Sequence, residues 1–145
     1  MRKLKICLVA VTMVAILITS GCVLNKNQKL VCKQTSQGVD IQFNVGFKGN
    51  TIESMDFSYD MDLASYSDLQ INAIKGQDFC NIVKNSMSQY SNAFTNCNQN
   101  IENKHLSVTA AFDINKLANN VLDKLASPKA AKSDLEKQGY TCNFE

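Results

Sequence analysis

Strict alternation of apolar and polar residues constrains the fold of this chain more than any other feature of its sequence. Apolar side chains occupy every second position over residues 39–47, and the same period of two returns over 55–63 and 106–114. This period is typical of a strand that buries one face and leaves the other in water. Short polar turns separate the first of these strands from its neighbours along the chain. We therefore expect a strand over 30–34 and the two strands that follow it to form an antiparallel meander.

A helical period of three and four residues replaces the alternation in other parts of the chain. It predicts a short helix over 68–75, a longer helix from an N-cap at Asp78 to Phe94, and a helix over 117–125. Ser127-Pro128 is expected to begin a last helix, which Gly139 ends.

The fold predicted from these elements is an α+β domain with an antiparallel sheet. The sheet consists of the three-strand meander, a fourth strand over 106–114 and a short C-terminal strand over 140–144. Two or three helices cover one face of it. The Asn-rich segment 95–104 is expected to be a loop or the entry to a strand.

An apolar run near the N-terminus predicts export from the cytoplasm. Arg2, Lys3 and Lys5 precede an apolar stretch over 6–18, and three small residues, Thr19-Ser20-Gly21, follow it. This order is typical of a secretion signal. The apolar stretch is shorter than the roughly 20 residues that a membrane-spanning helix needs.

Cys22, directly after the small residues, predicts a lipid anchor. Ser20-Gly21-Cys22 resembles the lipobox of bacterial lipoproteins, although Thr19 stands where such signals most often have Leu. The resemblance implies cleavage between Gly21 and Cys22 and a diacylglycerol on the Cys22 sulfur, and two acyl chains give stable anchoring. The alternatives are a retained signal anchor and a cysteine placed by chance.

The expected organisation is a lipoprotein signal peptide over 1–21, a lipidated tether over 22–29 and a single extracytoplasmic domain over 30–145. The expected location is the extracytoplasmic face of the cell membrane, with the lipid bilayer as partner through acylated Cys22 and palmitate as a typical acyl group.

The charge that remains after processing argues against a nucleic-acid partner. Three of the 15 Lys and Arg residues leave with residues 1–21, so 12 remain against 13 Asp and Glu. No basic stretch is left that would bind nucleic acid. Lys26 and Lys29 lie next to the expected lipid, but two charges are weak evidence for contact with anionic headgroups.

The cysteines that remain predict disulfide bonds. Cys7 leaves with the signal and Cys22 is acylated, which leaves four: Cys32, Cys80, Cys97 and Cys142. Four cysteines in a small exported domain favour two disulfides in one of three connectivities. Free buried thiols are one alternative. A metal site is another, although the chain has no C-x-x-C pair and its single histidine, His105, is isolated.

Short segments of the chain resemble the YehR-like family, which has no established function. They are FDINKL over 112–117 and LEKQGYTC over 135–142, together with the order of the expected elements. The chain is thus identified as similar to small bacterial lipoproteins of the Firmicute type. In this family the first strand begins L-x-C and the chain ends G-Y-x-C, as Leu30-Val31-Cys32 and residues 139–142 do here. The resemblance implies a disulfide between Cys32 and Cys142 across neighbouring strands.

Pairing Cys32 with Cys142 leaves Cys80 with Cys97, and an uninterrupted helix opposes that second bond. A straight helix over 79–93 would hold its two ends roughly 20 Å apart at 1.5 Å per residue. A disulfide needs Cα atoms within about 7 Å of each other. The serine-rich stretch over 86–91 would have to break the helix, which its weak helix formers permit.

Four polar residues are the candidates for a chemical site: Asp56, Asp60, Asp62 and His105. The three aspartates share one face of a strand, and calcium favours such oxygen ligands, but the spacing is not that of an EF-hand and a solvated strand face explains the same pattern. His105 has no nucleophile or carboxylate at a recognisable spacing. We therefore predict no catalytic residue, no metal site and no cofactor.

The sequence leaves two classes of function open. The favoured one is a non-enzymatic binding or interaction module, held at the membrane, for an unknown protein or small-molecule partner. The alternative is a small envelope enzyme or metal-binding factor that uses the Asp56/Asp60/Asp62 face or His105.

Overall fold

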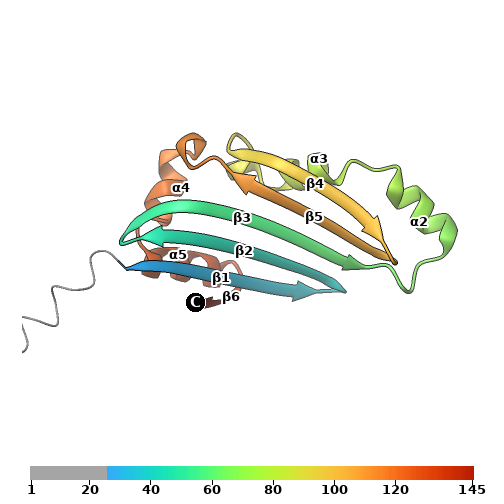
Figure 1. Cartoon of the computed structure of the whole chain (residues 1–145), viewed down its shortest axis with the longest axis horizontal. Coiled ribbons are helices and arrows are strands. Elements are labelled where there is room, and N and C mark those ends of the chain that lie inside the picture. Colours follow the sequence, from blue (N-terminus) through green and yellow to red (C-terminus); the bar gives the residue numbers. More distant parts are fainter. Residues whose placement is uncertain (1–25) are drawn as a thin grey trace, which may run out of the picture.

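Six antiparallel strands form one twisted sheet, and helices lie against one of its faces (Figure 1). The computed structural model describes residues 26–145, so the predicted signal peptide over 1–21, its cleavage site at Gly21 and the lipidation site Cys22 lie outside the described residues. Among residues 26–145, no helix combines the length and the apolar character needed to cross a membrane.

The order of the strands in the sheet differs from their order along the chain. They are β1 (Asn27–Ser36), β2 (Val39–Lys48), β3 (Thr51–Asp62), β4 (Phe94–Glu102), β5 (His105–Phe112) and β6 (Thr141–Phe144). In space they run β4-β5-β3-β2-β1-β6. The helices are α2 (Asp68–Lys75), α3 (Phe79–Ser86), α4 (Asn119–Lys124) and α5 (Pro128–Lys137), with 3₁₀ turns η1 (Ser88–Tyr90) and η2 (Ile114–Lys116). β1 begins inside the segment expected to be tether, because Asn27 already pairs with Lys48 of β2.

The predicted five-stranded sheet is wrong, although the α+β class and the β1-β2-β3 meander are present. The segment expected to be a loop forms β4, an edge strand antiparallel to β5. After β3 the chain crosses to that far edge through α2 and α3, and β5 then returns between β4 and β3. The Asn103-Lys104 turn joins β4 to β5 with positive φ at both residues, as a tight hairpin turn requires.

β4 escaped prediction because its sequence lacks the usual strand pattern. Its residues FTNCNQNIE are mostly exposed, as expected of an edge strand that buries neither face completely. A bulge interrupts the register between Thr95 and Asn98, and Asn96 has a positive φ of 48°. The bulge breaks the period of two, so hydrophobic alternation gave no indication of a strand.

The second predicted helix is shorter than expected. α3 ends at Ser86, and the 3₁₀ turn η1 replaces the continuation to Phe94. The other boundaries follow their capping residues. Ser67 and Gln70 form a capping box on α2, and the Ser127 hydroxyl accepts from the backbone N–H of Ala130 at the start of α5, where Pro128 holds the first helical position.

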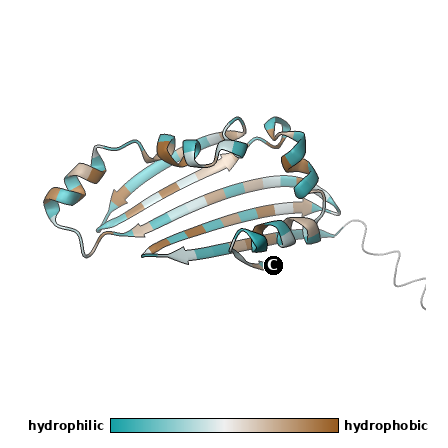
Figure 2. Cartoon of the chain, turned by 180° about the vertical axis from the view of Figure 1, so that it is seen from behind, coloured by the Kyte–Doolittle hydropathy of each residue, from teal (hydrophilic) through white to brown (hydrophobic). Residues whose placement is uncertain are grey.

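The apolar face of the sheet packs against the helices, as the alternation predicted. Figure 2 shows α3, α4 and α5 lying over this face. One cross-strand row runs through the middle of the core, where Phe43 of β2 lies between Cys32 of β1 and Phe57 of β3. The largest fully buried side chains from strands and helices include Phe47, Leu30, Met55, Leu106, Leu125 and Leu135. The opposite face carries polar side chains, and no helix formed by residues 26–145 covers it (Figure 1).

A disulfide between Cys32 and Cys142 joins β1 to β6. The two residues are direct cross-strand partners with Cα atoms 4.0 Å apart, and both are buried. This is the pairing that the family resemblance implied. It fixes the short last strand to the sheet at a sequence separation of 110 residues.

Candidate functional site

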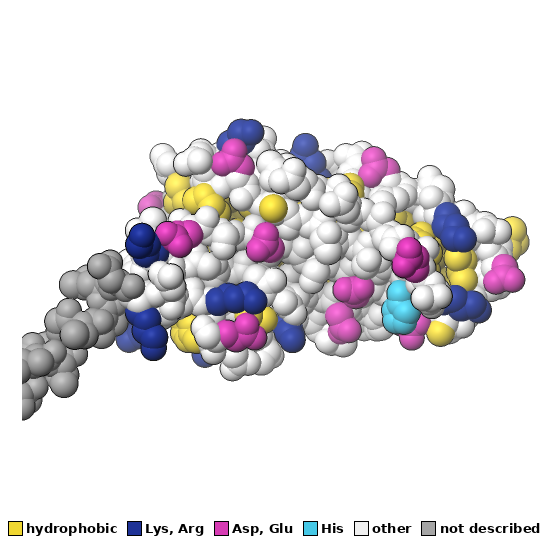
Figure 3. Space-filling model, viewed as in Figure 1, with side chains coloured by type: hydrophobic (Ala, Val, Ile, Leu, Met, Phe, Trp, Pro, Cys, Tyr) yellow, Lys and Arg dark blue, Asp and Glu magenta, His cyan; other side chains and the backbone are white. Residues whose placement is uncertain are grey.

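The open face of the sheet contains a polar hollow at the end where β1 turns into β2. It has a volume of about 590 Å³, and we call it the acidic hollow. The polar side chains that line it are Lys33, Gln34, Thr35, Asp40, Gln42, Ser58, Asp60, Asp62 and His105. In Figure 3 the single histidine lies on this face beside acidic side chains, far from the end where the chain enters β1.

The acidic hollow unites three of the four residues proposed from the sequence. Asp62 is the direct cross-strand partner of His105, and Asp60 is two residues before Asp62 on the same face of β3. Asp56 does not join them, because it lies in a separate hollow near Glu53 and Glu145. The sequence-based grouping of three aspartates on one strand face is thus divided between two surfaces.

Two carboxylates of the acidic hollow stabilise local structure. Asp40 accepts a 2.6 Å hydrogen bond from the Thr35 hydroxyl across the β1–β2 hairpin. Asp62 accepts from the backbone N–H of Ala64 at 2.8 Å and so holds the turn after β3. Asp40 is also the direct cross-strand partner of Asp60. Like charges in this arrangement repel each other, and water weakens the repulsion because both side chains are exposed.

The arrangement of the titratable side chains in the acidic hollow can be compared with that of a metal or acid–base site. Among residues 26–145, no three His, Cys, Asp or Glu side chains are arranged to hold a metal ion. Within the same residues no hydrogen bond or ion pair engages the His105 ring.

A second concave surface lies on the helical side, between α3 and the middle of the sheet. We call it the apolar groove, and its volume is about 250 Å³. β2 and β3 form its floor, α3 forms one wall, and the residue before β6 closes it. Its lining side chains are Ile41, Phe57, Tyr59, Phe79, Ile82, Val83, Ser86, Met87 and Tyr140.

A large apolar side chain is exposed at the rim of the apolar groove. Ile82 on α3 is 48% exposed, whereas Val83 beside it is buried. A pocket that is mainly apolar with a few polar groups is typical of small-molecule sites. The polar groups here are the hydroxyls of Tyr59, Tyr140 and Ser86, of which Ser86 donates to the Val83 carbonyl oxygen at 2.8 Å.

Burial affects the ionisation of both tyrosines in the apolar groove. Loss of solvent raises the pKa of Tyr59, with a smaller contribution from nearby Tyr66, and loss of solvent also raises the pKa of Tyr140. Both phenols therefore stay neutral at physiological pH. The Tyr59 hydroxyl donates to the Met61 sulfur at 3.7 Å. The groove thus combines aromatic walls with neutral hydroxyl donors.

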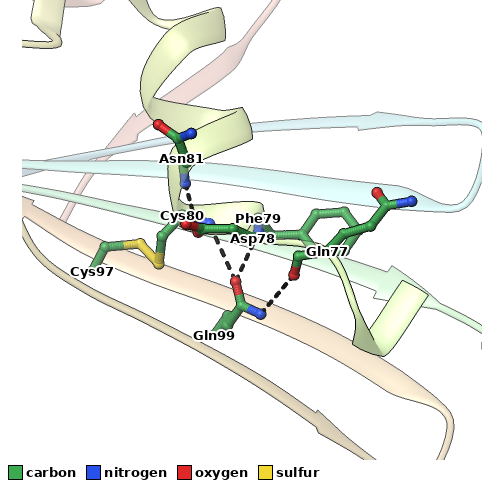
Figure 4. The surroundings of a disulfide bond; sticks show 7 residues. All are labelled: Gln77, Asp78, Phe79, Cys80, Asn81, Cys97 and Gln99. Carbon is green, nitrogen blue, oxygen red and sulfur yellow. Dashed lines mark hydrogen bonds between the residues drawn. A yellow bond between two sulfur atoms is a disulfide. The ribbon is translucent and has the colours of Figure 1, made fainter. Parts of the chain in front are cut away.

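Two residues of the edge strand β4 hold the start of α3 at the wall of the apolar groove (Figure 4). Cys97 on β4 forms a disulfide with Cys80 in the first turn of α3, with Cα atoms 5.8 Å apart. The Gln99 side chain accepts from the backbone N–H groups of Phe79 and Cys80 and donates to the Gln77 carbonyl oxygen. Because α3 ends at Ser86, the helix length that opposed the Cys80–Cys97 bond does not arise.

The sequence did not reveal the apolar groove. Its lining comes from β2, β3, α3 and the segment before β6, and no local pattern brings these together. One signal was present. The apolar stripe of this helix includes Phe79, Ile82 and Val83, and such a stripe usually faces the core, whereas Ile82 is 48% exposed in this fold.

Comparison with known proteins relates the chain to others through its fold. No family model matches the sequence, and no curated protein matches it either. Among solved structures, the NMR structure of the Escherichia coli YehR protein matches with a TM-score of 0.50 and 13% identity, over 81% of this chain and 91% of that one. The fold is similar to that of YehR. An NMR structure of a protein from Streptococcus pneumoniae TIGR4 has a TM-score of 0.48 and 16% identity, over 82% of this chain and 86% of that one.

The likeness to YehR concerns the fold alone, because the sequence identity is only 13%. It agrees with the resemblance drawn from the LEKQGYTC and FDINKL segments. It carries no information on lipid attachment, ligand or activity.

Proposed function

We propose that this chain is a membrane-anchored extracytoplasmic lipoprotein and that its domain is a non-enzymatic binding module. The observation that carries the proposal is the pair of disulfides, Cys32–Cys142 and Cys80–Cys97, which are typical of proteins outside the reducing cytosol. They support export by the N-terminal signal. The Ser20-Gly21-Cys22 sequence supplies the anchor, five residues before β1 begins at Asn27.

The apolar groove is the proposed binding site, and its occupant is a small, mainly apolar ligand that carries a hydrogen-bonding group. A volume of about 250 Å³ accommodates a ring-sized group, since a cavity of roughly 150 Å³ holds benzene. Aromatic walls at Phe57 and Phe79 would contact the apolar part. The Tyr140 hydroxyl would donate to the polar group.

The alternative, an enzyme or metal-binding factor, has weaker support. The one observation in its favour is that Asp60, Asp62 and His105 share the acidic hollow. Asp62 is exposed and accepts a hydrogen bond from the backbone of the turn after β3, so its position on the surface is explained without a ligand. In the apolar groove, by contrast, the large apolar side chain of Ile82 is left 48% exposed.

Fatty-acid labelling tests the anchor. Cells that express the full chain should incorporate labelled palmitate into it, and Cys22→Ala should abolish the label and leave an unprocessed precursor. Cys7→Ala is the matched control, since this cysteine lies in the apolar stretch that leaves with the signal. Unchanged label on the Cys22→Ala protein would sink the lipoprotein proposal.

Photochemical labelling with benzophenone tests the apolar groove in the mature, lipidated protein. Irradiation should attach the probe to the peptide that contains Ile82 and Met87, and Ile82→Lys should remove most of this label by placing a charge at the rim. Leu69→Lys, at a side chain that is 82% exposed on α2, should leave it unchanged. Label spread evenly over all exposed apolar residues would instead count against a specific site.

A further inference from the structure

The end of the domain where the chain enters β1 gathers lysines from several elements. Lys26 precedes β1, Lys29 lies on β1, Lys48 ends β2, and Lys129 and Lys132 lie on α5. We call these five residues the basic end. In the sequence Lys26 and Lys29 form one close pair and Lys129 and Lys132 another, and the fold brings these pairs and Lys48 to one end of the domain.

Backbone contacts and a shared hollow hold the basic end together. The Gly49 N–H after β2 donates to the Lys26 carbonyl oxygen at 3.3 Å, and Asn27 is the cross-strand partner of Lys48. A hollow of about 570 Å³ is lined on one side by Lys26 and on the other by Lys129. Figure 3 shows basic side chains at this end of the molecule.

Among the described residues, two of the five lysines of the basic end are paired with carboxylates, and the other three are not. Lys29 lies 3.4 Å from Glu145, and Lys132 lies 3.7 Å from Glu136. Within residues 26–145, the other three, Lys26, Lys48 and Lys129, have no carboxylate within 4 Å. The acidic hollow lies at the opposite end of the strands, whereas Glu53, Asp56 and Glu145 line a hollow with Lys29 near the basic end.

An exposed aromatic ring adds an apolar element to the basic end. Phe144, the last residue of β6, is 43% exposed and lines the same hollow as Lys26 and Lys129. The Lys132 ammonium lies 5.7 Å from the centroid of its ring. An aromatic ring surrounded by lysines is typical of surfaces that lie at the headgroup level of a membrane.

We propose that the basic end docks on the anionic phospholipid headgroups of the leaflet that holds the anchor. This inference rests on the proposed acylation of Cys22. Lys26 is four positions after Cys22, which limits the gap between them to about 14 Å at 3.5 Å per residue. That distance is close to the Debye length of about 8 to 10 Å, so the lysines feel the surface potential.

Docking at this end has a consequence for the binding site. The strands run away from the basic end, so the domain stands upright on the membrane with β1 pointing outward (Figure 1). Ile41 and Tyr59 of the apolar groove lie toward the outer half of their strands and remain accessible from the envelope.

A single introduced tryptophan tests the docking, because the chain contains none. The mature, lipidated Phe144→Trp protein is incorporated into vesicles of brominated phosphatidylcholine, with or without brominated phosphatidylglycerol. We expect bromine to quench the introduced indole when phosphatidylglycerol is present. Leu69→Trp, at the far end of the molecule, is the control and should stay unquenched in both.

Charge removal makes the test specific. Lys26→Gln, Lys48→Gln and Lys129→Gln combined in the Phe144→Trp protein should reduce the ratio of docked to undocked protein about a hundredfold, at about fivefold for each lysine. High salt should act in the same direction.

The outcomes separate this proposal from the anchor. Protein that floats with the vesicles but is unquenched at position 144 overturns the docking, leaves the anchor standing and frees this surface for a protein partner. Equal quenching in neutral vesicles, or at both tryptophan positions, also overturns it. Protein that fails to float with the vesicles overturns the anchor, and the docking with it.

Discussion

The side chain of Gln99 accepts a 2.7 Å hydrogen bond from the backbone N–H of Phe79, twenty residues earlier in the chain. The same oxygen also accepts from the next N–H, at Cys80. These two donors have no partner within α3, because the first N–H groups of a helix always lack one. A strand residue therefore caps a helix, and Asp78, the local N-cap, satisfies only the N–H of Asn81.

Removing this cap should destabilise the domain moderately. We expect Gln99→Ala to lower the free energy of unfolding by about 1 kcal/mol, in the range of helix N-caps, because water replaces part of the lost bonds at this exposed position. Urea unfolding measures this loss of free energy, and the dependence of the unfolding free energy on urea concentration should be the same in both proteins. Asn100→Ala, on the opposite face of β4, is the matched control and should have little effect. Equal losses from both substitutions would contradict a capping role for Gln99.

The period of two predicted correctly which residues of the central strands face the core. Phe43, Val45 and Phe47 are buried, and the polar residues between them face the open side. The period of two did not predict the edge strand β4. β4 pairs through its backbone with little side-chain burial, and its bulge shifts the register, so a pattern based on burial could not find it.

The candidate site was less predictable than the fold. Asp62 and His105 are 43 positions apart and meet only because β5 pairs with β3 in the sheet. The apolar groove depends equally on where α3 ends. α3 ends at Ser86, within a stretch of weak helix formers. Helix propensity is too weak a guide to predict the last residue of a helix in such a stretch.

A pair of neighbouring substitutions tests the register of the sheet. Phe43→Asp should prevent stable folding, because this 3%-exposed side chain packs against Phe57 at a centroid distance of 5.2 Å and a carboxylate there has no partner. Gln42→Asp, on the open face, should change the melting temperature little. Thermal unfolding followed by circular dichroism compares the two. Similar melting temperatures for the two variants would contradict this assignment of the faces of β2.

Stability should fall steeply in alkaline solution because of Tyr90. Burial, together with the negative charge of Asp134 and the neighbouring Tyr140, raises the pKa of Tyr90 to about 12 from its usual value of 10. Between these pH values the unfolded chain releases the phenolic proton while the folded chain keeps it, so the unfolded state binds fewer protons and stability decreases with rising pH. Below pH 10 the group is neutral in both states and has no such effect.

Tyr90→Phe isolates this contribution. The variant should lose stability less steeply between pH 10 and 12, since Tyr59 and Tyr140, whose pKa values burial also raises, keep acting in the same direction. Urea unfolding at a series of pH values gives the slope. An identical slope for the two proteins would show that Tyr90 ionises as readily in the folded chain as in the unfolded one.

The two disulfides should differ in their contribution to stability. Cys32–Cys142 closes a separation of 110 residues, and Cys80–Cys97 closes only 17. The chain-entropy model assigns about 5 kcal/mol to the longer loop and about 3 kcal/mol to the shorter one. Cys32 and Cys142 are also fully buried, so their replacement removes packing as well.

Paired alanine variants measure this difference. Cys32→Ala with Cys142→Ala should destabilise the domain by about 2 kcal/mol more than Cys80→Ala with Cys97→Ala. Urea unfolding of the mature protein without reductant gives both values, and peptide mapping of the unreduced wild type establishes that each pair is linked. The short pair has a second readout, since it holds α3 over the apolar groove: its loss should weaken benzophenone labelling of the Met87 peptide. A larger stability loss from the 17-residue bond than from the 110-residue bond would contradict the entropic argument.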